Sequence, residues 1–142
     1  MPSSDPEILA AKLRMAIVWA SRRQRLERSS EAITDGQYGV LSALSRLGPL
    51  TPGALADIEH VQPPSVTRMV NCLVDAGLVT RSEHPTDGRA VVITITDAGE
   101  AEVVETRRRR NAWLAGRLAA LTANERKSLD QAADLINQLV NE

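Results

Sequence analysis

Hydrophobic residues recur at helical spacing along most of this chain. The stripe nearest the N-terminus predicts a helix that begins at Pro6 and ends near Arg28. The next stripe predicts a helix that begins at Thr34 or Asp35, either of which is a favourable N-cap residue. A Gly-Pro pair at Gly48 would stop that helix. The pattern therefore predicts a mainly α fold.

Two shorter helices with a tight turn between them are predicted next. The first opens at Thr51, a capping residue that precedes a proline, and the second opens at Pro63 and ends before Gly77. The second helix has one apolar face and one polar face, which is typical of the recognition helix of a helix-turn-helix. An equally simple interpretation is that the polar side chains only solvate a surface helix. The polar face carries Ser65, Thr67, Arg68, Asn71 and Asp75.

The segment that follows alternates with the period of β-strands. Residues 78–83 and 90–96 read as two strands, and the turn-forming residues between them predict a hairpin. A helix-turn-helix followed by a hairpin is a winged helix. Arg89 at the predicted tip suits a minor groove, whose negative potential attracts a guanidinium, and Asp87 could orient it. The alternative is a solvent-exposed tip at which these two residues only pair with each other.

The C-terminal third is predicted to form two more helices. A long one runs from Ala98 to about Leu121, with Thr96 and Asp97 at its cap and Glu100 in the capping-box position after Asp97. A second capping box, Thr122 with Glu125, opens the last helix. The first and last helices would have little core of their own in a single chain, which favours a two-fold dimer. The predicted divisions are an N-terminal dimerisation helix at 1–30, a winged helix-turn-helix lobe at 31–97 and C-terminal dimerisation helices at 98–142.

Composition and charge narrow the possible functions. The chain has 142 residues, 43% of them hydrophobic, and its two Trp, one Tyr and absence of Phe disfavour proteins that stack single-stranded bases. The net charge is −1, and residues 51–96 hold three arginines against five carboxylates. This acidic balance supports an alternative function, a winged-helix protein-interaction module that does not read DNA. A single cysteine and the lack of a bilayer-length apolar run fit a cytoplasmic protein.

Three other features of the sequence bear on possible chemistry. His60 and His84 lack the spacing of metal ligands, and no nucleophile motif or phosphate-binding glycine loop is present, so we expect neither an enzyme nor a cofactor. Cys72 is better explained as a small helix residue than as a redox switch. Residues 107–110 are four consecutive arginines, and on a helix their side chains would project to all sides. This favours a solvated or dimer-pairing role over nucleic-acid binding.

Three segments together resemble the MarR family of bacterial winged-helix regulators. They are "ITDGQYGVLSAL", "LTPGALADIEHVQPPSVTRMVNCLVDAGLVTR" and "DGRAVVITITDAG", and the resemblance covers nearly the whole chain. It implies a homodimer that binds double-stranded DNA at a pseudo-palindromic operator, with one recognition helix in each of two successive major grooves. The implied function is that of a sequence-specific transcriptional regulator, a repressor relieved by a small phenolic or lipophilic effector.

The resemblance also assigns site residues. By position it makes Ser65, Thr67 and Arg68 the recognition-helix contacts and Arg89 the wing-tip contact, with Asp87 as the partner that orients the wing arginine. Pro64, Asn71 and Arg81 are also expected to contact DNA. Trp19, Tyr38 and Trp113 could line an effector pocket, although core packing explains such rings equally well.

Overall fold

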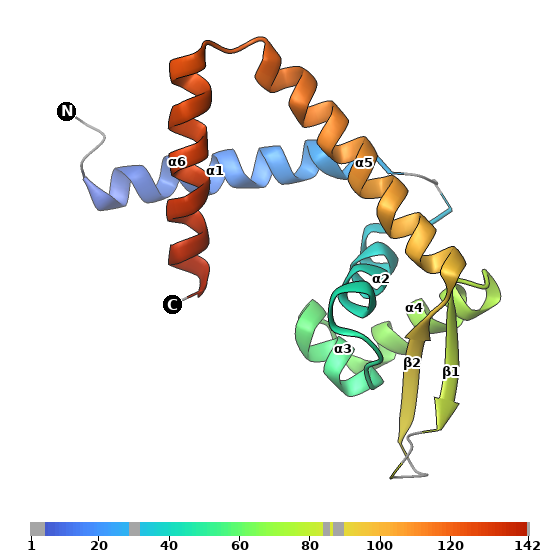
Figure 1. Ribbon diagram of the computed structural model, residues 1–142. Coiled ribbons are helices and arrows are strands. Elements are labelled where there is room, and N and C mark those ends of the chain that lie inside the picture. The colour runs from blue at the N-terminus through green and yellow to red at the C-terminus, as the bar shows by residue number, and fades with distance from the viewer. Residues whose placement is uncertain (1–4, 29–31, 84–85, 87–89, 142) are drawn as a thin grey trace. The chain divides into compact units, whose positions relative to one another are not determined.

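The computed structural model forms two units (Figure 1), which we call the lobe and the terminal unit. The lobe comprises residues 25–109, and the terminal unit comprises residues 1–24 and 110–142. The residues that the structure describes are 5–28, 32–83, 86 and 90–141. The elements in order are α1 (Pro6–Arg25), α2 (Asp35–Leu47), α3 (Pro52–Glu59), α4 (Pro63–Asp75), β1 (Val79–Glu83), β2 (Val91–Ile95), α5 (Asp97–Ala119) and α6 (Ala123–Asn141).

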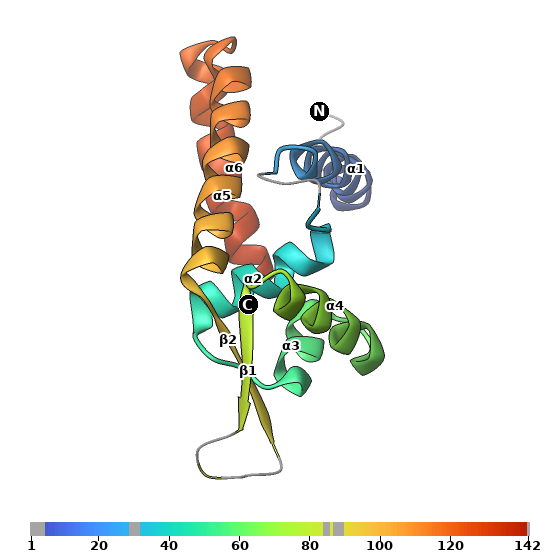
Figure 2. The same cartoon turned by 90° about the vertical axis from the view of Figure 1, so that its right-hand side faces the viewer.

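The lobe is the winged helix that the sequence predicts. Helices α2, α3 and α4 pack against one another, and the hairpin of β1 and β2 follows α4 directly (Figures 1 and 2). Their inward faces form a single core. The buried hydrophobic residues are Val40, Leu41, Ala43, Leu44, Leu55, Ala56, Val66, Val70, Leu73, Leu78, Val79, Ile93 and Val103.

Side-chain caps set the starts of the first two lobe helices. Thr34 is the N-cap of α2 and forms a reciprocal capping box with Gln37, so both residues satisfy a free backbone N–H. Thr51 caps α3 by accepting a hydrogen bond from the N–H of Ala54 at 3.2 Å. Helix α3 ends where His60 adopts a left-handed conformation, with φ of 54°.

The connection from α4 to the hairpin depends on a glycine. Gly77 has φ of +74°, a conformation that costs little energy only without a Cβ. It turns the chain so that the N–H of Leu78 donates to the carbonyl of Leu73 at 2.9 Å, which closes the last turn of α4. The predicted stop at this glycine is confirmed, and it sets where β1 begins relative to the recognition helix.

The hairpin is antiparallel, and it is also joined to the helix-turn-helix. Arg81 pairs with Ile93 in the register of β1 and β2. On its other side Ile93 forms an isolated bridge with Leu50, through backbone hydrogen bonds of 2.8 and 3.1 Å. Leu50 lies in the connection between α2 and α3, so this bridge holds the hairpin against the first helices of the lobe.

The start of α5 differs from the predicted capping box. The N-cap is Thr96, whose hydroxyl oxygen accepts from the N–H of Gly99 at 3.1 Å and whose hydroxyl donates to the carbonyl of Gly77 at 2.8 Å. Glu100 does not return to the cap: its carboxylate accepts a 2.8 Å hydrogen bond from the hydroxyl of Ser45 in α2. The capping box of Asp97 with Glu100 was therefore wrong, because a tertiary partner is available to the glutamate.

The terminal unit has well-formed helices but little interior. The predicted capping box that opens α6 is confirmed, with the N–H of Thr122 donating to Glu125 at 2.9 Å and the N–H of Glu125 donating to Thr122 at 3.1 Å. Neither α1 nor α6 buries a residue among those described. Helix α1 ends at Arg25, slightly before the predicted end near Arg28.

Candidate nucleic-acid interface

The recognition helix α4 presents its polar face on a well-packed support. Val66, Val70 and Leu73 are buried against α2 and α3 and fix the rotation of the helix. The opposite side is open to solvent, and most of the predicted contact residues lie on it. Pro64, Thr67, Arg68 and Asn71 are exposed, and Ser65 is half-buried. An exposed row of short polar side chains on a rigid helix is the arrangement that major-groove recognition needs.

Two local hydrogen bonds organise the first turns of this face. The hydroxyl of Thr67 donates to the carbonyl of Pro63 at 3.2 Å, so its oxygen lone pairs remain available as acceptors. The guanidinium of Arg68 donates to the hydroxyl oxygen of Ser65 at 3.3 Å. Arg68 keeps further N–H groups for a phosphate or a base, because a guanidinium has five of them.

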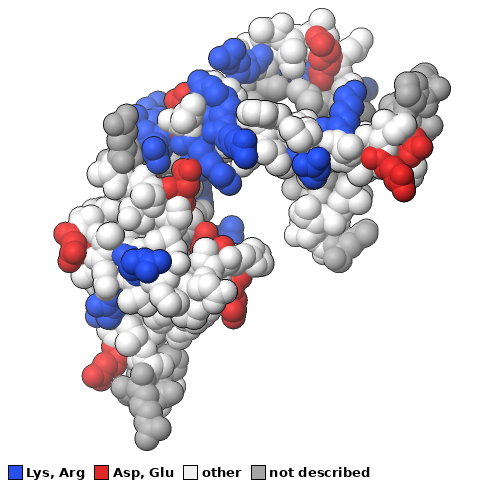
Figure 3. Space-filling view, turned by 180° about the vertical axis from the view of Figure 1, so that it is seen from behind, with Lys and Arg blue, Asp and Glu red and all other residues white. Residues whose placement is uncertain are grey.

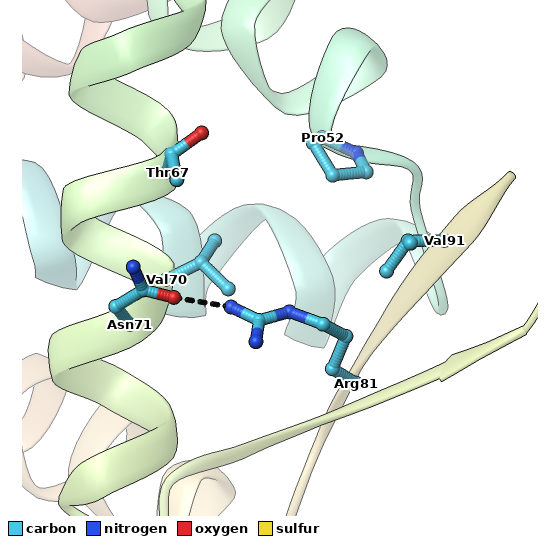
Figure 4. A pocket seen from close by; sticks show the side chains of 6 residues that line it. All are labelled: Pro52, Thr67, Val70, Asn71, Arg81 and Val91. Carbon is cyan, nitrogen blue, oxygen red and sulfur yellow. Dashed lines mark hydrogen bonds between the residues drawn. The ribbon is translucent and has the colours of Figure 1, made fainter.

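A longer-range contact joins the helix to the wing. Arg81, on β1, donates a hydrogen bond to the side-chain oxygen of Asn71, on α4. Figure 4 shows these two side chains pointing toward each other, with Thr67 on the same side of α4. Both residues were expected as separate DNA contacts. Their pairing was not predicted, because nothing in the sequence indicates that residues ten positions apart meet across the turn at Gly77.

A shallow hollow of about 230 Å³ lies between α4, the start of α3 and the hairpin. The polar rim is formed by Thr67, Asn71 and Arg81, and apolar side chains form the rest (Figure 4). Pro52 and Val91 belong to that apolar part and were not among the predicted site residues. No sequence pattern marks them as site residues, because a half-buried proline or valine is ordinary at the start of a helix or strand.

Charge over the lobe is mixed. Figure 3 shows basic and acidic side chains interspersed over the lower part of the lobe in that view, without one continuous basic face there. Burial raises the pKa of the Glu59 carboxyl, an effect that Arg46 and His60 partly offset. Glu59 lies against Gly39 of α2, where a Cβ would collide with its carboxylate. The lobe thus carries at least one carboxylate whose charge is disfavoured by its position.

Several predicted features fall elsewhere. Arg89 and Asp87, the wing residues, lie outside the described residues. Of the arginine run, Arg108 and Arg109 both bond to Glu105, at 2.7 and 3.0 Å, and hold the pKa of that carboxyl at about 2. Cys72 is exposed.

The aromatic residues proposed for an effector site divide between the two units. Tyr38 is half-buried and packs against the lobe core. Trp19 and Trp113 belong to the terminal unit, where Trp19 is 60% exposed. The indole N–H of Trp113 is buried without an acceptor among the described residues. The guanidinium groups of Arg23 and Arg117 lie 4.7 and 5.7 Å from its ring centroid.

Within the described ranges, no group of three or more histidine, cysteine, aspartate or glutamate side chains is placed to hold a metal ion. In the same part of the chain, no helix has both the length and the apolar character needed to cross a membrane.

Comparison with known proteins agrees with this geometry. The sequence model of the MarR family matches residues 33–91, which span α2, the helix-turn-helix and the start of β2. The HTH-type transcriptional regulator Mb0904 of Mycobacterium bovis is 43% identical over 134 residues, covering 94% of each chain. The chain belongs to the MarR family. As a MarR family protein it is a DNA-binding transcriptional regulator, and regulators of this family act as dimers.

Two further matches cover most of the chain. The HTH-type transcriptional repressor MdtR of Bacillus subtilis is 28% identical over 127 residues, covering 88% of this chain and 82% of the repressor. The crystal structure of RV1404 from Mycobacterium tuberculosis superposes with a TM-score of 0.82 at 29% identity, covering 96% of this chain and 94% of that one. The similarity therefore extends beyond the winged helix to the terminal helices.

Proposed function

We propose that this MarR family regulator is a repressor that binds a pseudo-palindromic operator as a homodimer and is released by a small-molecule effector. The observation that carries the proposal is the exposed polar face of α4, held on the buried side chains of Val66, Val70 and Leu73. The likeness to the repressor MdtR favours repression over activation. Two recognition helices would enter major grooves about 34 Å apart, one helical turn of DNA.

Within this function each predicted contact has a distinct task. The polar side chains of α4 would meet base edges, and the arginines would meet phosphates or guanine. Arg89 at the wing would enter the minor groove, oriented by Asp87. The proposed contact residues are Pro64, Ser65, Thr67, Arg68, Asn71, Arg81 and Arg89.

We propose that the dimer forms through the terminal helices, at 1–30 and 98–142. The supporting observation is the exposed apolar surface of the terminal unit. Leu129, Leu135 and Leu139 of α6 are 48%, 60% and 68% exposed in the single chain. Side chains of this size rarely stay exposed in a row on a stable helix, so a second copy is the economical cover.

The effector would be a small phenolic or lipophilic anion. Trp113 supports this choice, because its buried indole N–H could donate to an anionic oxygen and two guanidinium groups lie near its ring. Trp19 and Tyr38 are the other proposed effector residues. A ligand that prefers a dimer with a different spacing of recognition helices would reduce the DNA-competent population. The protein would act in the cytoplasm, without a cofactor and without enzymatic activity.

A salt series tests the DNA function directly. Fluorescence anisotropy would compare binding to DNA from upstream of the protein's own gene with binding to a shuffled duplex of equal composition. The logarithm of the binding constant should fall with the logarithm of salt concentration, with a slope of about −0.9 for each phosphate neutralised. The mixed charge of the lobe predicts a shallow slope. Equal binding to both duplexes, independent of salt, would instead favour the protein-interaction module.

The wing is tested with one variant. Arg89→Ala should weaken binding to the upstream duplex while the circular dichroism spectrum and the dimer remain unchanged. Arg110→Ala, which removes one arginine from the long helix, is the matched control for charge loss. Unchanged affinity of Arg89→Ala with an intact fold would exclude the wing as a contact.

A further inference from the structure

The pairing of Arg81 with Asn71 fixes the orientation of the Asn71 amide. A guanidinium carries only hydrogen-bond donors, so the atom of the amide that faces it must be the oxygen. The NH₂ group of Asn71 therefore points away from the wing (Figure 4). The outward group of this side chain is consequently a donor.

Both partners of this pair stand on rigid supports. Val70, the neighbour of Asn71, is 2% exposed and anchors that turn of α4 in the core. Arg81 pairs in register with Ile93, which is fully buried and bridged to Leu50. The helix and the strand are thus held together through the lobe core, and the side-chain contact does not depend on a flexible segment.

This orientation changes what Asn71 can recognise. A free asparagine amide pairs with adenine through two hydrogen bonds, accepting from N6 and donating to N7. The hydrogen bond from Arg81 uses one lone pair of the amide oxygen and holds that oxygen toward the wing, so the NH₂ donor is the group that Asn71 presents on its other side. The bases whose major-groove edges offer acceptors without a donor are guanine, through N7 and O6, and thymine, through O4. The pair therefore disfavours the two-bond pairing with adenine that a freely turning asparagine amide makes.

We propose that Arg81 is a positioning residue that holds Asn71 as a hydrogen-bond donor and thereby selects guanine or thymine at one position of each operator half-site. This inference rests on the proposed function, because it requires α4 to enter the major groove. It goes beyond that function by assigning a base preference to one side chain and its cause to another.

The test is selection of binding sites from a duplex pool with randomised half-sites, carried out with the full-length dimer. The wild-type protein should enrich guanine or thymine at one position, and Asn71→Ala should abolish that preference. Arg81→Ala should shift the same position toward adenine, because the released amide can turn and pair with both N6 and N7. The preference for adenine should reach about fivefold or more, the range of a good bidentate pair.

Two variants sharpen the test. Asn71→Asp should pair with Arg81 and leave no outward donor, so the preference should move to cytosine, whose N4 donates. Arg81→Lys keeps a group that can only donate and should keep guanine or thymine. Arg68→Ala is the matched control, since it removes an exposed arginine of the same helix face and should lower affinity without changing the preference at this position. All five substitutions are at exposed positions, and the circular dichroism spectrum of each variant would show whether it is folded.

The outcomes separate this inference from the proposed function. A wild-type protein that selects no sequence overturns both. A wild-type protein that selects a sequence, together with an Arg81→Ala variant that loses affinity for every site equally, overturns the inference alone. That second result would make Arg81 a phosphate contact and no more.

Discussion

The lobe and the terminal unit use hydrophobic residues in opposite ways. Every buried hydrophobic side chain among the described residues lies between Val40 and Val103, inside the lobe. Most of the large exposed ones lie in the terminal unit, on α1, on α6 and on the second part of α5. Both regions have helices with an apolar stripe, so the stripe alone does not form a core. The lobe has enough elements to cover its stripes within one chain, whereas the terminal unit leaves most of its large apolar side chains exposed in the single chain.

Helix α5 has both buried and exposed apolar residues. Its first turns bury Gly99, Val103 and Thr106 in the lobe. Farther along the helix Leu114 is 44% exposed and lines a groove of about 440 Å³ with Leu118 and Leu129. The same helix therefore contributes to the lobe at one end and presents uncovered surface at the other, which is where we propose that the second subunit packs.

The largest predicted effect is on the lobe core. Leu41→Ala removes a fully buried side chain and should lower the free energy of unfolding by about 2–5 kcal/mol. Leu47→Ala is the control in the same helix, because Leu47 is 53% exposed and should cost far less. Urea denaturation followed by circular dichroism at fixed protein concentration measures both. Equal losses would contradict the division into buried and exposed stripes.

Next in size is the junction of the wing with α5. A Cβ at Gly99 would collide with the backbone carbonyl of Leu78 and lie 2.6 Å from Ile95, so Gly99→Ala should destabilise the lobe by about 1–3 kcal/mol. The steric cost should exceed the gain in helix propensity of about 1 kcal/mol. Gly53→Ala is the matched control, because that glycine of α3 has open space around its Cβ position. A stabilised Gly99→Ala variant would show that this packing is looser than described.

A change in the terminal unit should act on assembly. Leu129→Asp places a charge in the groove of α5 and α6 and should weaken the dimer by about tenfold or more, or about 1.4 kcal/mol. Sedimentation velocity over a range of concentrations measures the change, and the lobe should keep its circular dichroism spectrum. Lys127→Asp, which places an aspartate at a neighbouring exposed position of α6, serves as the control and is measured by the same sedimentation experiment. A Leu129→Asp dimer as tight as the wild type would exclude this groove from the interface.

The smallest predicted effect is a pH dependence within the lobe. Burial raises the pKa of Glu59, so the folded state binds its proton more readily than the unfolded state does. Stability should therefore rise as pH falls through the raised pKa, and Glu59→Gln should remove this contribution. Glu105 has the opposite effect on stability, because its pKa of about 2 in the folded state lies below its pKa in the unfolded chain. Its stabilising contribution is therefore present at pH values above the unfolded-state pKa and is lost as the pH falls toward 2. Unfolding curves of Glu59→Gln and Glu105→Gln across pH should diverge from the wild type in opposite directions.

Local signals in the sequence were sufficient for most of the elements. The caps at Thr51 and Thr122 were predicted correctly, and Thr34 was one of two candidates for its helix, because an N-cap bonds to a backbone group only two or three residues away. The stop at Gly77 follows from a conformation that one residue type adopts readily. These rules do not depend on the rest of the fold.

The errors and omissions involve contacts between distant segments. Glu100 had the correct spacing for a capping box, but Ser45, fifty-five residues earlier, takes its carboxylate. The bridge from Leu50 to Ile93 could not be expected from either segment alone. For the candidate site, the sequence identified the polar residues of α4 by their periodicity but could not pair Asn71 with Arg81.

The order of hydrophobic and polar residues by itself determined the helices, the hairpin and the face of α4 that meets solvent, because each depends on interactions within a few residues. Only the tertiary structure decided which side chains use their hydrogen-bonding groups on each other. That depends on the path of the backbone between segments, such as the turn that brings Arg81 to Asn71. Arg81 holds the acceptor oxygen of the Asn71 amide toward the wing, so the chemistry offered by the recognition helix is a property of the folded lobe.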